Sequence, residues 1–334
     1  MDMPPRQLVQ RTLEFGSPPR IPRQLWALPW AHLHYPRETV AIQSRFPDDI
    51  LHCPTFLRVE CPTEGNRYVP GTYVDEWGCS FTSVQAGIIG QVKTPLVTDW
   101  RMLDAVRPPA EALSVDTQRV SAFCRQTDRF VLGGCCPRPF ERLQFLRGTE
   151  QVFVDLARQS PELLVLLRRI HDFYVQELEV WAATAVDGLM FMDDWGGQQA
   201  MLIAPDLWRR LFKPLYADYI ALAHRHGKSI WMHSDGYILD ILPDLVELGL
   251  DAINCQVGCM GVQTLEVFAR RITFWGELDR QHLLPRGTRA EVVAAVREMK
   301  TALYRDGGVI AQCEFGPGAN PDNIAAAFET WDES

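Results

Sequence analysis

The chain of 334 residues is long enough for one large α/β barrel, and its 47% hydrophobic residues can bury a substantial core. The 42 acidic residues outnumber the 33 basic ones, and the net charge of −9 argues against a nucleic-acid-binding protein, which normally has a basic face. No apolar run of about 18 residues predicts a membrane span, the first residues lack signal-peptide features, and nine cysteines without a CxxC pair predict a reducing, cytoplasmic setting.

The first half of the chain contains three segments that we predict to be strands, at residues 21–28, 55–60 and 130–136. Between the second and third of them, residues 66–98 include YVDEWGCSF and have the pattern of an inserted antiparallel excursion. This half is less regular than the second half.

Strands and helices alternate cleanly in the second half of the chain. Apolar runs with β-branched or aromatic residues predict strands at 188–194, 228–235, 250–257, 271–278 and 307–315. Helical periodicity fills the intervals at 161–186, 205–226 and 238–248, and Thr288 with Glu291 has capping-box spacing at the start of another helix. Eight such units predict fold class α/β, with a single (β/α)8 barrel over residues 1–334 and the excursion inserted in its N-terminal half. Neither GxGxxG nor GxxxxGK[ST] supports a nucleotide-binding open sheet.

Polar residues end five consecutive predicted strands, where a (β/α)8 barrel carries its reactive groups. In chain order these residues are Asp193 and Asp194, His233 and Asp235, Cys255 and Gln256, Glu277 and Asp279, and Cys313 and Glu314. Because neighbours in a strand face opposite ways, at most one of Asp193 and Asp194 points inward. A helix cap or turn is an alternative role for Asp235, and Cys255 has the alternative of a plain buried thiol.

His233 and Cys313 together have the chemistry of a zinc site, because imidazole and thiolate are ligands that zinc prefers. A carboxylate from Asp235, Glu277 or Asp193 would complete the coordination and leave one position open for substrate. The spacing is no established zinc motif, and a metal-free acid–base pair of His233 and Asp235 stays open.

Three tryptophans lie where a substrate pocket is expected. Trp26 and Trp30, with Trp195, would form an apolar pocket for a small neutral substrate, and Gln256 lies at the same predicted rim. Plain core packing is the alternative for these tryptophans, which are common in protein interiors.

Eight longer stretches occur in the order FGSPPRIP, YVDEWGC, PFERLQFLRGTE, DDWGGQ, IAPDLWRRLFKPLY, HGKSIWMHSDG, FWGELDRQHLLPRGT and GPGANPDNI. Through these stretches nearly the whole chain resembles the uroporphyrinogen decarboxylase superfamily, and more closely its corrinoid-dependent methyltransferase branch. The resemblance implies a (β/α)8 barrel. That superfamily contains cofactor-free porphyrinogen decarboxylases, and methyltransferases that use zinc to move a methyl group between a corrinoid and a thiol. Some of its members are homodimers.

The chain departs from the family patterns at two places. The decarboxylases carry an arginine-containing loop after the first strand, whereas this chain has WALPWAHLHYP there and no arginine between Arg23 and Arg37, which disfavours a polycarboxylate substrate. The zinc methyltransferases carry His-x-Cys on the fifth strand and Cys on the eighth. His233 and Cys313 match two of those ligands, and Asp235 stands in place of the remaining cysteine.

The resemblance therefore predicts a zinc-dependent methyltransferase that acts on a small methylated substrate, with a corrinoid carried by a partner protein or a thiol as its partner. His233 and Cys313, with Asp235 or Glu277, would hold the zinc. Asp194 or its neighbour Asp193 would orient the substrate or hydrogen-bond to His233.

Two other functions remain open at this point. One is a cofactor-independent decarboxylase in which Asp193 or Asp194 stabilises a cationic intermediate, and the other is a non-catalytic binding barrel. Basic side chains over the mouth of the barrel would favour the decarboxylase, and an apolar funnel near His233 would favour methyl transfer.

Overall fold

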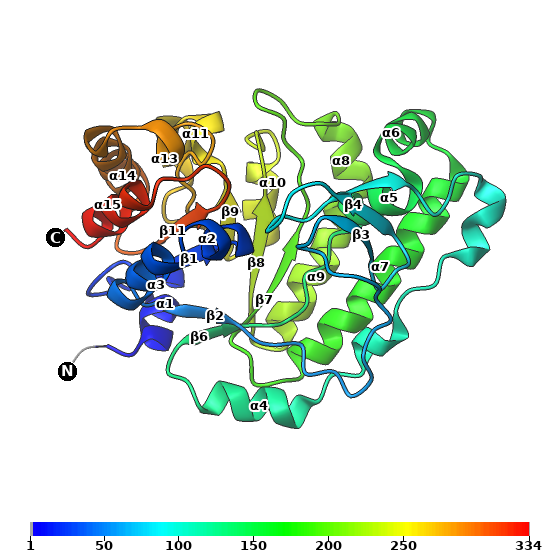
Figure 1. Cartoon of the computed structure of the whole chain (residues 1–334), viewed down its shortest axis with the longest axis horizontal. Coiled ribbons are helices and arrows are strands. Elements are labelled where there is room, and N and C mark those ends of the chain that lie inside the picture. The colour runs from blue at the N-terminus through cyan, green and yellow to red at the C-terminus, as the bar shows by residue number, and fades with distance from the viewer. Residues whose placement is uncertain (1–2, 334) are drawn as a thin grey trace.

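A computed structural model describes residues 3–333, and at its centre eight parallel strands form a nearly closed barrel (Figure 1). The strands follow one another in the order β1-β11-β10-β9-β8-β7-β6-β2. Their bounds are β1 (Arg23–Ala27), β2 (Ile50–His52), β6 (Phe130–Leu132), β7 (Gly188–Met192), β8 (Ser229–Ser234), β9 (Ala252–Cys255), β10 (Thr273–Trp275) and β11 (Val309–Phe315). The predicted α/β barrel class is thereby confirmed.

Helices follow the barrel strands along the chain. The α-helices are α1 (Pro5–Leu13), α2 (Pro29–His34), α3 (Pro36–Arg45), α4 (Thr117–Arg125), α5 (Pro139–Arg147), α6 (Thr149–Arg158), α7 (Pro161–Ala182), α8 (Pro205–Leu211), α9 (Lys213–Arg225), α10 (Leu242–Leu248), α11 (Val257–Met260), α12 (Val262–Leu265), α13 (Leu283–Arg286), α14 (Arg289–Leu303) and α15 (Pro321–Trp331). Short 3-10 helices are η1 (Trp100–Ala105), η2 (Ala110–Leu113) and η3 (Glu266–Phe268). Among the described residues, none of these helices is long and apolar enough to cross a lipid bilayer.

A small antiparallel sheet interrupts the first half of the barrel. It consists of β3 (Gly71–Val74), β4 (Ser80–Ser83) and β5 (Gln91–Thr94), which confirms the excursion expected at residues 66–98. Figure 1 shows β3 and β4 beside α5 and α7. The buried Arg142 of α5 joins the two parts, because it donates to Asp75 at 2.5 Å and to Glu76 at 3.2 Å.

The second barrel strand was placed wrongly by the sequence analysis. It covers Ile50–His52. The predicted segment 55–60 is largely exposed and, within residues 3–333, its β-pairing is limited to an isolated bridge from Leu57 to Val115. Ile50 supplies the side chain that packs inside the barrel, so burial fixes the strand five residues earlier than the β-branched pattern indicated.

The interior of the barrel is a small cluster with large aromatic members. Met190, Trp231, Trp275 and Ile310 project inward from neighbouring strands, and Val9 of α1 packs against the same cluster. The rings of Trp231 and Trp275 meet edge to face with centroids 4.9 Å apart. Such filling makes the barrel a packed core, so open space for chemistry lies at its ends.

The barrel is completed between β1 and β2 chiefly by side chains, since the two strands lie at opposite ends of the hydrogen-bonded order. Asp48 accepts from the backbone of Leu25 at 2.7 Å, and Asp49 accepts from the backbone of Arg23 at 2.9 Å. The guanidinium of Arg20 also binds both oxygens of Asp49, at 2.7 and 2.6 Å. The side chains of Asp48 and Asp49 thus connect β1 to the start of β2, and we call this connection the seam.

Helix boundaries agree with the expected signals in most places. Thr288 and Glu291 form a complete capping box at the start of α14, and Gly249 ends α10 in a left-handed conformation. The stretch expected as one helix at 205–226 is instead two helices, which meet at Phe212 just before Pro214. A proline at the second position of α9 is compatible with a new helix start but not with an unbroken helix.

Candidate active site

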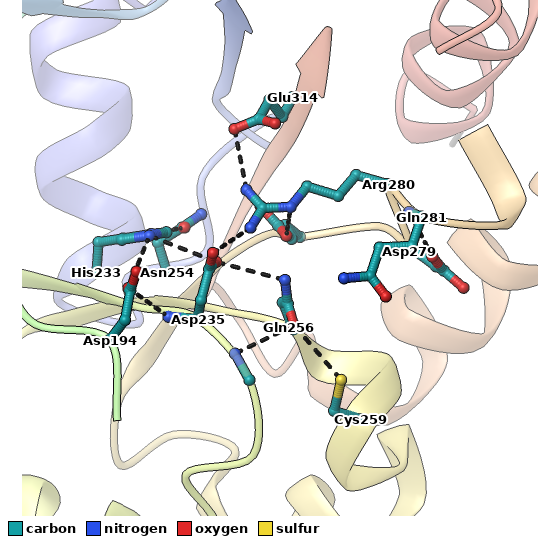
Figure 2. Close-up of polar contacts among 12 residues, drawn as sticks. Asp194, His233, Asp235, Asn254, Gln256, Cys259, Asp279, Arg280, Gln281 and Glu314 are labelled. Atoms are coloured by element: carbon teal, nitrogen blue, oxygen red, sulfur yellow. Dashed lines mark hydrogen bonds and ion pairs between the residues drawn. The ribbon is translucent and has the colours of Figure 1, made fainter. Parts of the chain in front are cut away.

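Three side chains at the carboxyl ends of β7 and β8 converge on one point (Figure 2). Nε2 of His233 lies 3.6 Å from Oδ1 of Asp194 and 3.5 Å from Oδ1 of Asp235. Each of the three residues offers one ligand atom, and these atoms lie within 4.8 Å of one another. Among residues 3–333, this is the one group of three or more histidine, cysteine or acidic residues with such a spacing. We call it the Asp-His-Asp cluster.

Asn254 on β9 fixes the orientation of the His233 ring. Its side-chain oxygen lies 2.5 Å from Nδ1 of His233, and its side-chain nitrogen donates to the carbonyl oxygen of Trp275. Because the Asn254 amide donates to that carbonyl, its oxygen must face the histidine, so Nδ1 carries a hydrogen and donates it. Nε2 is then the nitrogen that faces the two carboxylates.

Opposing effects act on the pKa of His233. Burial lowers this pKa, but the negative charges of Asp235, Asp194 and Glu277 together raise it above its usual value. In the absence of a metal ion, the ring therefore binds a proton readily at Nε2. A bound metal ion would take the place of that proton.

The two aspartates of the cluster are held by the loops that follow β7 and β8. Oδ1 of Asp194 accepts from the backbone nitrogen of Asp235 at 3.0 Å. The loops touch so closely that a Cβ at Gly236 would lie 2.1 Å from the carbonyl oxygen of Gly196, and Gly236 has a φ of +76°. Only glycine satisfies both demands at this position.

Gln256 supports the second aspartate from β9. Its side-chain oxygen accepts from the backbone nitrogen of Gly236 at 3.1 Å, and its nitrogen lies 3.4 Å from Oδ1 of Asp235. The structure therefore places Gln256 behind Asp235 at the rim of the barrel, where the sequence analysis expected a substrate-binding residue.

Arg280 is surrounded by three carboxylates. It binds Oδ2 of Asp235 and lies 3.0 Å from Oε2 of Glu314 (Figure 2). It also lies 3.4 Å from Oε1 of Glu277. Burial raises the pKa of Glu277 to about 7, and Arg280 limits that rise. Neither oxygen of Glu277 has a hydrogen bond within the described part of the chain. Glu277 thus lies behind Arg280, outside the Asp-His-Asp cluster.

Asp193 and Asp194 face opposite ways. Asp193 is fully buried and accepts from the backbone nitrogens of Phe140 at 3.0 Å and Glu141 at 2.9 Å, and from the hydroxyl of Tyr216 at 2.7 Å. These nitrogens belong to the first turn of α5, where four donors otherwise lack helical partners. Asp193 therefore fixes the start of α5, and only Asp194 reaches the mouth of the barrel.

The structure does not bring Cys313 to the cluster. Val309, Ala311, Cys313 and Phe315 pack outward against the helices, whereas Ile310 on the alternate face packs inside the barrel. Burial raises the pKa of the Cys313 thiol, and the charge of Glu277 raises it further. The thiol is therefore kept protonated in an apolar layer, and the adjacent inward-facing residue is Glu314.

Of the three tryptophans expected to line a pocket, the structure brings one to the cluster. The ring centroid of Trp26 lies 5.4 Å from that of His233 and 5.1 Å from that of Trp275. Trp30 is buried against His34, and Trp195 is fully buried in a stack with Phe140, with centroids 4.2 and 4.1 Å apart. Trp30 and Trp195 are therefore part of the hydrophobic core.

Two residues at the centre of this site were missed by sequence reasoning. Asn254 carries a signal in retrospect, because it lies two positions before Gln256 and therefore on the same face of β9. Arg280 follows Asp279 in a loop and had no periodic pattern. A cation is nevertheless expected close to a rim that collects this many acids.

Open space lies beside Gln256 and Arg280, the two residues that contact Asp235. A cavity of about 320 Å³ is lined by residues that include Gln256, Cys259, Glu277 and Arg280. On the other side of Arg280, a second cavity of about 640 Å³ reaches Glu314 and Pro317. A small molecule can therefore approach Arg280 from either side.

Comparison with protein-family models identifies the chain's relatives. The family model for uroporphyrinogen decarboxylase (URO-D) matches residues 72–334, which include the whole Asp-His-Asp cluster. The chain belongs to the uroporphyrinogen decarboxylase family.

Solved structures agree with this family's barrel fold. The methyltransferase from Methanosarcina mazei superimposes with a TM-score of 0.70 at 16% identity, over 99% of this chain and 98% of that one. The 3-keto-D-glucoside 4-epimerase from E. coli gives a TM-score of 0.39 at 15% identity, over 69% of this chain and 87% of the other. We infer nothing from a similarity this low. The comparison with curated proteins gave no match to this chain.

Proposed function

We propose that this barrel is a zinc-dependent methyltransferase for a small methylated substrate, with the metal held by Asp194, His233 and Asp235. The observation that carries the proposal is the pairing of a three-ligand cluster with a fixed tautomer. The ring donates through Nδ1 to Asn254 and presents Nε2 to the carboxylates, as metal-binding histidines do.

The donor set fits a catalytic zinc. One imidazole nitrogen and two carboxylate oxygens supply three protein ligands, and catalytic zinc sites commonly combine three such ligands with one open position. The proposal replaces Cys313 by Asp194 as a ligand, because Cys313 faces the outer layer. Zinc bound here would polarise the group that loses its methyl or lower the pKa of an acceptor thiol.

The residues around the cluster have separate tasks in this proposal. Asn254 holds the His233 ring, and Gln256 with Arg280 holds Asp235 from two sides. Trp26 supplies an apolar wall beside His233 that suits a methyl-bearing group. We propose a corrinoid-carrying protein as methyl donor or acceptor on the basis of the family resemblance, together with the methyltransferase from Methanosarcina mazei that shares the fold.

The charge of the mouth supports methyl transfer over decarboxylation of a polycarboxylate. The rim collects the acids Asp194, Asp235, Glu277 and Glu314, and the one arginine among them, Arg280, is already paired with three of these acids. A substrate with several carboxylates would meet net repulsion here, since like charges at close range raise the free energy of binding.

The deciding experiment is the metal content of purified protein, measured by mass spectrometry after growth with added zinc. We expect about one zinc per chain in the wild type and loss of most of it in His233→Ala and Asp194→Asn, since each variant removes one of three ligands. Cys313→Ser is the matched control and retains the metal. Circular dichroism establishes that all variants are folded.

Two results would contradict the proposal. One is folded wild-type protein that takes up no zinc, and the other is zinc that is lost in Cys313→Ser but retained in His233→Ala. With zinc established, transfer of a methyl group to or from a free corrinoid then tests the reaction itself, and its absence in zinc-loaded protein would refute methyl transfer.

A further inference from the structure

A separate cavity lies between the small sheet and α7, beside the carboxyl end of β6. Its volume is about 400 Å³, and we call it the β6 cavity. Gly134 and Cys135 line it, as do the aromatic side chains of Trp77, Phe81, Phe173 and Trp181. None of its lining residues belongs to the Asp-His-Asp cluster.

Most charged groups deep in the β6 cavity are already paired. Arg142 lies 2.5 Å from Asp75 and 3.2 Å from Glu76. Arg138 lies 4.0 Å from Glu141, which is anchored through its backbone nitrogen to Asp193. Arg142 is therefore neutralised by the protein itself. Arg67, the third arginine of the cavity lining, lies over the ring of Tyr73 at 5.7 Å.

Glu177 on α7 differs from these residues. Within residues 3–333 its carboxylate has neither a hydrogen bond nor an ion pair, although it lines the cavity and is half-buried. Two residues further along the same helix, Glu179 faces outward and lies 3.0 Å from His226. α7 thus carries one externally paired glutamate and one glutamate that faces a cavity without a partner.

Such a carboxylate is costly to leave alone. Burial, and next the charge of Glu76, raise the pKa of Glu177 to about 7, although the charges of Arg142 and Arg138 limit that rise, so part of the population holds a proton at neutral pH. A cation in the cavity would remove this penalty, because an opposite charge at close range stabilises the ionised form. Arg142 already lies over the Trp77 ring at 5.0 Å, and the rings of Phe173 and Trp181 add to the preference, since ring faces attract organic cations.

We propose that the β6 cavity binds a small organic cation, with Glu177 as its counter-ion and the aromatic side chains around its apolar body. The volume suits a ligand of roughly ten to fifteen heavy atoms. The proposal does not depend on methyl transfer or on zinc, because no residue of the cavity is a metal ligand in the function proposed above.

The test is isothermal titration calorimetry of the full-length protein at pH 8, where Glu177 is largely ionised. The cationic probes are tetramethylammonium and benzyltrimethylammonium, and the neutral and anionic comparisons are benzyl alcohol and benzoate. We expect saturable binding of at least one cation, at least tenfold weaker binding in Glu177→Gln, and unchanged binding in Glu179→Gln. His233→Ala also binds the probe as the wild type does.

The variants are chosen so that every result is informative. Glutamine has the shape of the protonated glutamate that the fold already accommodates, so Glu177→Gln should remain folded, and thermal unfolding checks this. Failure of both cations to bind, equal binding by Glu177→Gln, or tighter binding of benzoate would each overturn the proposal. Loss of binding in His233→Ala would move the cation to the Asp-His-Asp cluster and also overturn it.

Discussion

Asn254 determines which nitrogen of His233 faces the carboxylates, and it does so without belonging to the cluster. We expect Asn254→Ala to lower zinc affinity by roughly 10- to 100-fold, because groups that hydrogen-bond to a ligand histidine commonly have effects of this size. Asn254→Asp is the matched control, since a carboxylate still accepts from Nδ1. Competition with a chelator measures the affinity, and equal affinity in Asn254→Ala and wild type would show that the ring needs no such support.

The alternation of side chains explains what sequence could say about single residues. The rule that neighbours in a strand face opposite ways limited Asp193 and Asp194 to one inward residue, and the structure has Asp194 inward. The same rule left β11 undetermined, because the family pattern pointed to Cys313 whereas burial turns Glu314 inward. Residue type alone does not fix the face of a strand that is buried on both sides.

Arg280 illustrates a limit of another kind. It comes from a loop, and its position depends on three acids that lie on different strands. No residue spacing in the sequence predicts that these four side chains lie close together, because their proximity arises only when the barrel has formed.

At the scale of elements, Arg142 joins α5 to the small sheet through several polar contacts of its guanidinium. Besides Asp75 and Glu76, its guanidinium lies 3.4 Å from the hydroxyl of Tyr174 and over the ring of Trp77 at 5.0 Å. The small sheet therefore depends on a planar guanidinium that makes several hydrogen bonds at once, which the single ammonium group of lysine cannot replace.

We expect Arg142→Lys to destabilise the protein by about 3 kcal/mol or more, since it leaves Asp75 buried with an incomplete partner. Trypsin should then cleave faster after Arg67 and Lys93, which flank the small sheet or lie within it. Arg101→Lys is the control, because that arginine is exposed and its one ion pair within residues 3–333 is with the nearby Asp99. Unchanged cleavage at both sites would show that the sheet is held by its apolar contacts instead.

Elements of the second half could be predicted because each strand is a contiguous apolar run bounded by helix signals, as at Gly249 and Thr288. β2 could not, because its three residues lie between Asp49 and Pro54 and lack the longer apolar run that surrounds β10, a strand of the same length. Its place is set by Ile50 inside the barrel, which is a tertiary contact.

For the whole molecule, the seam between β1 and β2 makes stability depend on pH. Burial raises the pKa of Asp48 to about 6, while its hydrogen bond from Leu25 and the charge of Arg129 lower it. The folded state therefore binds this proton more tightly than the unfolded chain, whose aspartates have a pKa of about 3.9. The contribution of Asp48 to stability is greatest below about pH 4 and is lost as the pH rises to about 6.

Asp48→Asn should remove this dependence, because the amide oxygen still accepts from Leu25 and carries no charge. Relative to the wild type, the variant should gain up to about 3 kcal/mol between pH 4 and pH 7, which is about two pKa units at 1.36 kcal/mol each. Urea unfolding at several pH values measures the difference. A difference that stays constant with pH would show that Asp48 has the same pKa in both states.

The edge-to-face tryptophan rings inside the barrel have a consequence for how its mouth can be observed. Trp231, Trp275 and Trp26 form a continuous series of ring contacts, and the last of them lies against His233. Excitation energy absorbed by any one of these rings can pass to the next at such short range, so the series ends beside the cluster. A quencher bound there, such as cobalt(II), would darken emission from the interior as well as from Trp26. The barrel thus carries its own fluorescent reporter of what its mouth contains.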